Sequence, residues 1–268
     1  MKNETVLITG ASSGIGLELA KCFAADGARL VLVARNTPAL EALAAELRQK
    51  FSLEVRVLTA DLGQPETPAR IFSELKSAGA TVDVLVNNAG FGTHGDFLET
   101  SLERQLEMVR VNVAALTHLT GLFLPDMIAR RRGGVLNVAS TSAFQPGPRM
   151  AVYYATKAFV LSFSEAVAEE TCGTGVTVTA LCPGPTKTNF GKVANFRGSE
   201  NFLRGAMTAE AVAADGHAAF RRGRVVVISG FPNRTLAFLV RFLPRIVVRK
   251  IVNRIITVRR PERAPEKV

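Results

Sequence analysis

A tyrosine and a lysine stand four positions apart in Tyr153-Tyr154-Ala155-Thr156-Lys157, and Ser140 precedes Tyr153 by thirteen residues. On a helix, residues four apart lie on the same face, so Tyr153 and Lys157 are predicted to be neighbours one turn apart. A nearby ammonium favours the phenolate and lowers the pKa of a phenol. Such a phenol can pass a proton to or from an alcohol or carbonyl oxygen near neutral pH. The spacing alone is weak evidence, because many helices carry this pair on a solvated face.

A glycine-rich turn near the start of the chain could hold a second reactant. The sequence Thr9-Gly10-Ala11-Ser12-Ser13-Gly14-Ile15-Gly16 stands between an apolar run and a helical pattern. Glycines there allow a tight turn and let a pyrophosphate approach the free N–H groups of a helix N-terminus. The two serines add hydroxyl donors. We therefore predict a dinucleotide site made by Gly10, Ser12, Ser13, Gly14, Ile15 and Gly16.

The elements that must position these residues alternate between apolar strands and helices. The predicted strands are rich in Val, Ile and Leu, as strands buried on both faces are: Thr5–Thr9, Arg29–Ala34, Glu54–Thr59, Val82–Asn87, Gly134–Ala139, Val176–Cys182 and Arg224–Ile228. The predicted helices are Ile15–Ala25, Pro38–Lys50, Pro65–Ser77, Leu102–Arg131, Val152–Glu170 and Ala209–Arg221. This alternation predicts an α/β fold: a single-domain, doubly wound parallel sheet of the Rossmann type with about seven strands.

These motifs, together with Asn87-Asn88-Ala89-Gly90 after the fourth strand, Asn112 and Pro183-Gly184, resemble the short-chain dehydrogenase/reductase family over about residues 5–230. The three-residue gap between the first two glycines resembles the shorter branch of that family. The resemblance implies hydride transfer between a nicotinamide and a carbonyl or alcohol carbon. It also implies an oligomer of identical chains.

The resemblance also implies roles for particular residues. Tyr153 is expected to be the general acid/base, Lys157 to lower its pKa and hold the nicotinamide ribose, Ser140 to bind the substrate oxygen, and Asn112 to support a proton relay. The cofactor cleft is expected to be bordered by Asn87, Ala89 and Gly90, the adenine by Asp61 and Leu62, and the nicotinamide by Pro183, Gly184, Thr186 and Thr188.

Several of these residues have plainer interpretations. Ser142 is an alternative to Ser140, although its eleven-residue distance from Tyr153 fits the family less well. Tyr154 has no basic residue four positions on, which favours a core or pocket-wall position.

Three further polar residues invite caution. Asn112 could be an ordinary packing residue in another fold, and Asp61 could only cap the turn that follows it. His94, in Phe91-Gly92-Thr93-His94-Gly95, is a lone histidine near the expected mouth of the cleft, and we give it no catalytic role.

The end of the second predicted strand decides between the two nicotinamide cofactors. An acidic residue there accepts hydrogen bonds from a free ribose 2′-hydroxyl and repels a 2′-phosphate. This chain has Leu32-Val33-Ala34-Arg35-Asn36, with Ala34 at the acidic position and Arg35 beside it. A guanidinium is a bidentate partner for phosphate, although a solvated surface arginine is the simpler interpretation. The missing acid favours NADP(H) over NAD(H).

Charge and cysteine content exclude other classes of protein. The net charge is +10, but residues 234–260 hold eight of the 33 basic residues and no acid, leaving 25 basic against 23 acidic residues elsewhere. A general nucleic-acid-binding surface is therefore not expected. Cys22, Cys172 and Cys182 match no metal or disulfide spacing, which predicts no metal site and a reducing compartment. No signal peptide is apparent, so we expect a cytoplasmic protein.

The chain divides into a catalytic domain, residues 1–232, and a basic extension, residues 233–268. Within the domain, a polar segment at about 187–208 is expected to form a lid over the substrate. Its apolar members indicate a hydrophobic substrate or simply pack the lid onto the body: Phe190, Phe196, Phe202 and Met207.

Pro244 is predicted to divide the extension into two short helices. No uncharged run there approaches the roughly twenty residues needed to span a bilayer. In the second helix one face is apolar (Val247, Val248, Ile251, Val252 and Ile255) and the other basic (Arg245, Arg249, Lys250 and Arg254). Such a helix can lie on an anionic membrane, here the inner membrane surface. Packing on the body or on a partner subunit is the alternative that we favour slightly.

The sequence therefore predicts an NADP(H)-dependent oxidoreductase that interconverts a carbonyl and an alcohol. One alternative is a membrane-associated reductase of lipid-like ketones, indicated by the basic extension. Another is a non-catalytic NADP-binding sensor or scaffold, which has no physical need for Asn112, Ser140, Tyr153 and Lys157 together.

Overall fold

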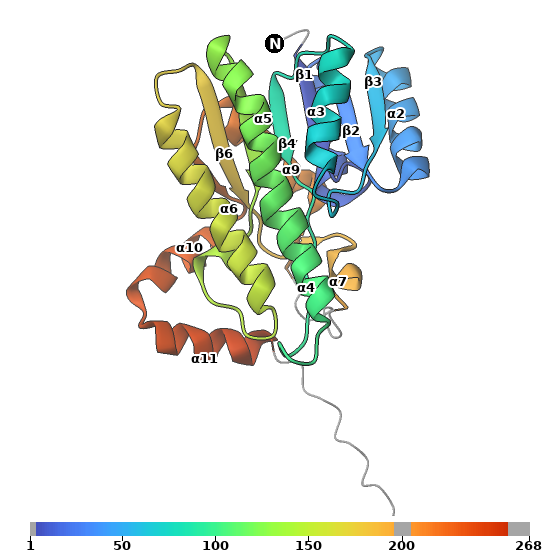
Figure 1. Ribbon diagram of the computed structural model, residues 1–268. Coiled ribbons are helices and arrows are strands. Elements are labelled where there is room, and N and C mark those ends of the chain that lie inside the picture. Colours follow the sequence, from blue (N-terminus) through green and yellow to red (C-terminus); the bar gives the residue numbers. More distant parts are fainter. Residues whose placement is uncertain (1–3, 196–204, 257–268) are drawn as a thin grey trace, which may run out of the picture.

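A parallel sheet forms the centre of the computed structural model, which describes residues 4–195 and 205–256 (Figure 1). Its seven strands have the order β3-β2-β1-β4-β5-β6-β9. Their bounds are β1 Thr5–Thr9, β2 Arg29–Ala34, β3 Val55–Thr59, β4 Val84–Asn87, β5 Gly133–Val138, β6 Val176–Cys182 and β9 Val226–Ile228. The order reverses between β1 and β4, where a doubly wound sheet opens a crevice at the carboxyl ends of its strands.

Helices cover both faces of this sheet. Alternate strand residues point to opposite sides, so Val6 and Ile8 join one core cluster and Leu7 joins the other. The first cluster is closed by α1 Gly14–Ala25, α2 Thr37–Phe51 and α9 Ala209–Arg221. The second is closed by α3 Thr67–Ser77, α5 Leu116–Ala129 and α6 Ala151–Glu170. The predicted doubly wound α/β fold is confirmed.

The predicted helix Leu102–Arg131 differs from the observed one. It consists of α4 Leu102–Val109, a wider π-helical stretch Arg110–Ala115, and α5, which ends at Ala129. In the described part of the chain, Leu102–Ala129 alone is long and apolar enough to cross a membrane by length and composition. It packs against α3, α6 and β5, as the central helix of an α/β layer does.

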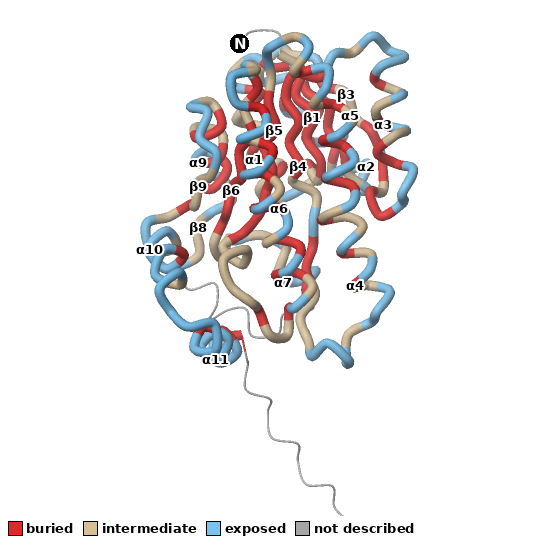
Figure 2. The backbone as a smooth tube through the Cα atoms, turned by 60° about the vertical axis from the view of Figure 1, so that its left-hand side comes forward, coloured by how far each residue is buried: buried red, intermediate tan, exposed pale blue. Residues whose placement is uncertain are grey.

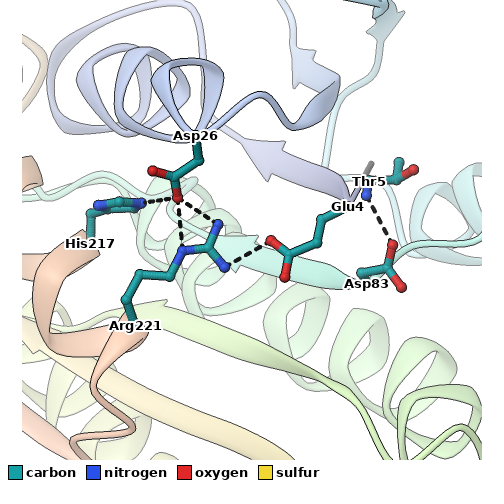
Figure 3. Close-up of polar contacts among 6 residues, drawn as sticks. All are labelled: Glu4, Thr5, Asp26, Asp83, His217 and Arg221. Atoms are coloured by element: carbon teal, nitrogen blue, oxygen red, sulfur yellow. Dashed lines mark hydrogen bonds and ion pairs between the residues drawn. The ribbon is translucent and has the colours of Figure 1, made fainter. Parts of the chain in front are cut away.

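Charged side chains tie the elements together at the amino-terminal edge of the sheet (Figure 3). Arg221 of α9 bonds the Asp26 carboxylate through Nε at 2.9 Å and the Glu4 carboxylate through Nη1 at 2.8 Å. His217 Nε2 lies 2.9 Å from the same Asp26 oxygen. The cluster therefore joins α9 to the end of α1 and to the residue before β1.

The remaining elements lie at the opposite edge, where the strands end. A small sheet of β7 Thr186–Lys187 and β8 Met207–Thr208 and the short helix α7 Phe190–Val193 border the site. Beyond β9, α10 Phe231–Leu239 and a 3-10 turn Val240–Phe242 lead to α11 Arg245–Ile256. Pro244 separates two short helices, as predicted. In Figure 1, α10 lies to the left of the lower half of α6, and α11 lies at the lower left, near the lower end of α6.

Candidate active site

Tyr153 and Lys157 occupy the first two turns of α6, at the carboxyl edge of the sheet. Both are almost fully buried, with exposed fractions of 8% and 6%. The Lys157 ammonium lies 5.9 Å from the centre of the Tyr153 ring and donates a 2.7 Å hydrogen bond to the carbonyl of Val138 at the end of β5. The helix therefore brings the two side chains together, as their spacing predicts.

Burial controls the pKa values of both groups. It raises the pKa of the Tyr153 phenol far above its ordinary value, and a hydrogen bond with the Ser140 side chain only partly opposes the rise. Burial also lowers the pKa of Lys157 to about 8, a shift that the Cys182 thiol opposes. The lowering of the Tyr153 pKa expected from Lys157 does not offset burial, so the net direction is the reverse of that expectation. Tyr153 is held as a neutral phenol, the form that donates a proton.

Two serine–tyrosine pairs stand side by side. Ser140 follows β5 and hydrogen-bonds Tyr153, whereas Ser142 hydrogen-bonds Tyr154. The Ser140 oxygen also accepts a 3.0 Å bond from the Ser142 backbone N–H, which orients it. The Ser140–Tyr153 pair adjoins Lys157. Tyr154 belongs to a buried apolar cluster, which is the core position that its lack of a following basic residue favoured.

Asn112 sits in the π-helical stretch and is 1% exposed. Its Oδ1 accepts from the Phe91 backbone N–H at 3.1 Å, and its Nδ2 donates to the Phe91 carbonyl at 3.0 Å and to Thr156 Oγ1 at 3.1 Å. Thr156 in turn donates to the carbonyl of Tyr153 at 2.7 Å. Asn112 thus ties the loop after β4 to the turn of α6 that carries Tyr153. Irregular π turns of this kind recur at functional sites.

The glycine loop has the geometry that an anion site needs. Gly10 and Gly14 have φ angles of +66° and +58°, which side chains other than glycine rarely adopt. A Cβ atom on Gly16 would lie 2.5 Å from the Gly10 carbonyl oxygen. Ser13 precedes α1 and its side chain makes no capping hydrogen bond among the described residues. The loop therefore presents the N-terminus of a twelve-residue helix, and these residues fit the pyrophosphate of a dinucleotide.

Asn88 is a structural support of this loop that the sequence reasoning missed. Its amide nitrogen donates to the carbonyls of Thr9 at 2.9 Å and Gly10 at 3.1 Å. The signal was present, since Asn88 stands inside the Asn87-Asn88-Ala89-Gly90 motif.

The other members of that motif divide their roles. The side chain of Asn87 points away from the cleft and donates to Thr120 of α5 at 3.1 Å and to Asn137 of β5 at 2.9 Å. The Asn87 side chain therefore does not line the cofactor cleft, as it was expected to. Ala89 is half-buried and Gly90 exposed. A Cβ on Gly90 would lie 3.0 Å from Asn112 Oδ1 and 3.5 Å from Lys157 Nζ, so the missing side chain keeps that space open.

At the expected adenine side, Asp61 accepts a 2.9 Å bond from the Gly63 N–H, which is the capping role considered for it. Asp61 also lines a cavity of about 380 Å³ that extends to Arg104 and Glu107 of α4. Leu62 is buried in the second core cluster. The cavity lies away from Tyr153, on the side where the adenosine is expected.

Arg35 lies beside this cavity. Its side chain is 61% exposed, and its guanidinium is 3.7 Å from the Glu107 carboxylate, which also pairs with Arg104 at 2.6 Å. Arg35 therefore has an acidic neighbour from α4 that the linear sequence did not reveal.

The loop after β6 borders the opposite side of the glycine loop. The Pro183 carbonyl accepts from the Thr141 N–H at 2.8 Å, and Thr186 donates to the Gly184 carbonyl at 2.9 Å. A Cβ on Gly14 would lie 3.2 Å from the Thr188 methyl group, so Thr188 faces the loop. Asn233 of α10 covers Gly184, where a Cβ would lie 2.3 Å from its amide nitrogen.

Apolar side chains pack around the ring of Tyr153. The ring of Phe190 lies 5.1 Å from that of Tyr153, and Met150 and Phe91 belong to the same cluster. Met207 instead packs against the first core cluster, so this residue of the expected lid packs the lid onto the body of the domain. Phe196 and Phe202 lie outside the described residues.

His94 lies at the far end of α11. Its Nε2 is 3.4 Å from the carbonyl of Ile256, and burial lowers its pKa. This position fits the structural role assumed for it. The described residues hold no group of three or more His, Cys, Asp or Glu side chains able to bind a metal ion.

The fold and this site define a class: a Rossmann-type oxidoreductase with a nucleotide loop beside a buried tyrosine. A model of the short chain dehydrogenase family matches residues 4–196, well over half of the 268-residue chain. The chain therefore belongs to the short-chain dehydrogenase family.

Curated relatives support this assignment. The uncharacterized oxidoreductase YvrD of Bacillus subtilis is 36% identical over 188 residues, which cover 70% of this chain and 70% of that protein. The very-long-chain 3-oxoacyl-CoA reductase of Homo sapiens is 32% identical over 196 residues, or 71% of this chain and 62% of that protein. The match thus spans less than two thirds of the human relative.

Solved structures share the fold over more of the chain. A short-chain dehydrogenase from Sphingobium yanoikuyae in complex with NADPH is 32% identical, with a TM-score of 0.80 over 98% of this chain and 99% of that one. A family member from Burkholderia phymatum in complex with NAD is 25% identical, with a TM-score of 0.79 over 89% and 92%. Neighbours of both kinds support a nicotinamide nucleotide as cofactor.

Proposed function

We propose that the protein is an NADP(H)-dependent reductase of hydrophobic ketones or aldehydes, which also runs in the reverse direction as an alcohol dehydrogenase. One observation carries the proposal. Ser140, Tyr153 and Lys157 are buried together at the carboxyl edge of the sheet, next to a glycine loop with two positive φ angles. A buried hydroxyl pair beside a nucleotide loop is the arrangement that carbonyl reduction requires.

The chain's own residues have distinct tasks in this reaction. The hydroxyls of Ser140 and Tyr153 bind the carbonyl oxygen, and the Tyr153 phenol gives its proton to that oxygen as the alcohol forms. Lys157, anchored on the Val138 carbonyl, holds positive charge one turn away and stabilises the phenolate that remains when Tyr153 has given up its proton. Asn112 is the positioning residue that fixes this turn of α6. When bound, the nicotinamide supplies or accepts the hydride.

The preference for NADP(H) rests on Ala34 and Arg35. No acidic residue ends β2, and Arg35 can turn from the Glu107 carboxylate, 3.7 Å away, toward a 2′-phosphate. The hydrophobic substrate rests on the rings and thioether around Tyr153, from Phe91, Met150 and Phe190. The name of the human relative fits a lipid-like ketone, and we keep this as the second candidate.

Two further properties belong to the proposal. The three cysteines carry free thiols, which fits a reducing cytoplasm. On α4, Leu102, Leu106 and Val109 form one exposed apolar stripe, which fits contact between identical chains. Light scattering of the purified protein tests the second point, because a strictly monomeric protein would contradict it.

The experiment that tests the function is a panel of ketones and aldehydes of increasing apolar size, followed by NADPH absorbance and by the amount of alcohol formed. We expect one alcohol per NADPH consumed and faster turnover for larger apolar carbonyls. Replacing NADPH by NADH tests the cofactor preference in the same assay. NADPH that binds, measured by its fluorescence, without consumption by any carbonyl would favour the sensor instead.

A further inference from the structure

Residues 231–256, here called the C-terminal arm, carry an unusual share of the exposed apolar side chains. The described residues include eighteen large apolar side chains that are exposed, and ten of them lie in the arm. Figure 2 shows α10 and α11 largely exposed. The ten are Phe231, Leu236, Phe238, Leu239, Phe242, Leu243, Ile246, Val247, Ile251 and Ile255. Such clustering marks an interaction surface, whereas single exposed apolar residues do not.

Helix α11 carries two apolar stripes, and only one of them packs on the body. Val248, Val252 and Ile256 are spaced by four and are buried in the cluster that contains Tyr153 and Tyr154. The predicted apolar face is thus divided, because its other stripe, Val247 with Ile251 and Ile255, is 38% to 59% exposed. The body holds the helix by the first stripe and leaves the second without a cover among the described residues.

The charge of the arm indicates what covers this second stripe. The arm contains six basic residues and no acid: Arg234, Arg241, Arg245, Arg249, Lys250 and Arg254. A second copy seated face to face would bring twelve cations together without an acidic partner from either arm, which like-charge repulsion opposes. Nucleic acid would neutralise the cations but leave the phenylalanines and isoleucines in water. Anionic phospholipid satisfies both the cations and the apolar groups.

We propose that the C-terminal arm docks on the surface of an anionic phospholipid bilayer, with Phe238, Phe242 and Ile251 among the side chains that enter the headgroup region. The arm lies on the bilayer and does not span it, because basic residues interrupt it every few positions. Since α11 also packs on the cluster around Tyr153, docking brings the reaction site beside the lipid.

Flotation of the full chain with vesicles of phosphatidylglycerol or of phosphatidylcholine tests this proposal. Ile251→Glu is the informative variant, and Val225→Glu is its matched control. The two side chains are 43% and 41% exposed, but Val225 precedes β9 at the opposite edge of the sheet. We expect wild type and Val225→Glu to float with phosphatidylglycerol and to be released by salt. We expect Ile251→Glu to bind phosphatidylglycerol vesicles at least about tenfold more weakly than wild type.

Turnover of a water-soluble carbonyl and circular dichroism show whether Ile251→Glu is folded. Arg249→Glu, on the same helix, provides a second variant with the same expected direction. Equal flotation of wild type and Ile251→Glu, or equal recovery with the two lipids, would overturn the proposal. So would a dimer that Ile251→Glu dissociates without any vesicle binding, since the stripe would then belong to a second copy. None of these outcomes depends on which carbonyl is reduced.

Discussion

The two edges of the sheet each hold a cluster of polar groups, partly buried at the amino edge and almost fully buried at the carboxyl edge, and the clusters are built on opposite principles. At the amino edge, Arg221 is bonded to two carboxylates, so its charge is balanced on the spot (Figure 3). At the carboxyl edge, no acidic side chain of the described residues pairs with Lys157, whose bond goes to a neutral carbonyl. Burial there shifts the pKa of Tyr153 upward and that of Lys157 downward.

The difference separates groups that hold the fold from groups that perform chemistry. Paired charges join elements and have little left to offer a ligand. A buried lysine without a counter-ion costs stability, and it persists where a reaction needs its charge or its proton. Substitutions at the carboxyl edge should therefore change turnover, and substitutions at the amino edge should change stability.

Apart from substitution of Tyr153, Ser140→Ala should have the largest effect of the substitutions at the two edges. It removes a donor to the carbonyl oxygen, and kcat/KM should fall by about 10² to 10³. Ser142→Ala is the matched control, because its hydroxyl serves Tyr154, and its kcat/KM should stay within about threefold. An equal fall in kcat/KM in both variants would show that Ser140 is not the reactive hydroxyl that distinguishes the two serines.

The pH dependence of the free energy of unfolding should show how much the burial of charged Lys157 destabilises the fold. Its pKa is about 8 in the folded protein and 10.5 in the unfolded chain, so between these values the unfolded chain binds more protons. Stability from this group is then lowest below pH 8 and rises with pH by about 1.4 kcal/mol per unit. Subtracting the unfolding free energy of Lys157→Met at each pH isolates this rise, about 3 kcal/mol in all. A flat difference across the range would show that Lys157 is not buried as a charge.

Arg221→Leu should lower the free energy of unfolding by about 2 kcal/mol, because it leaves the Glu4 and Asp26 carboxylates without their cation. Urea unfolding measures this loss, and turnover of the folded protein should change by less than about twofold. Arg132→Leu is the control. Its side chain is 70% exposed and 3.5 Å from Asp83, so less than about 1 kcal/mol is expected. Loss of turnover in folded Arg221→Leu would contradict the claim that substitutions at the amino edge change stability and not turnover.

Arg35→Asp should give the smallest change, in cofactor choice alone. An aspartate there repels a 2′-phosphate and accepts from a free 2′-hydroxyl, so the ratio of kcat/KM for NADPH over NADH should fall about tenfold or more. Arg48→Asp, on α2, should leave this ratio unchanged. An unmoved ratio in Arg35→Asp would remove the basis for the NADP(H) preference.

Much of the fold could be predicted because its signals are local. Strands buried on both faces read as continuous apolar runs, and Gly10 and Gly14 of the loop occupy positive φ angles that other residues avoid. The π-helical stretch around Asn112 could not be predicted. It depends on contacts with Phe91 and Thr156, which are 21 and 44 residues away. The division of the arm's apolar face failed for the same reason, because only the body decides which stripe is covered.

The site was predictable as a set of residues and less so as a set of contacts. The spacing of Tyr153 and Lys157 fixed their proximity, yet the direction of the Tyr153 pKa follows from burial, which sequence does not display. Asn233 reaches Gly184 from α10, about fifty residues further along the chain, and no motif announced it. The acidic partner of Arg35 likewise comes from a distant helix.

The most direct test of the account compares Tyr153→Phe with Tyr154→Phe, the only two tyrosines in the chain. Both side chains are 8% exposed, and each loses a hydroxyl bonded to a serine, so similar small losses of stability are expected. Single-turnover oxidation of bound NADPH by a reactive ketone should be about 10³-fold slower in Tyr153→Phe and within about threefold of wild type in Tyr154→Phe. Equal rates in the two variants would contradict Tyr153 as the proton donor.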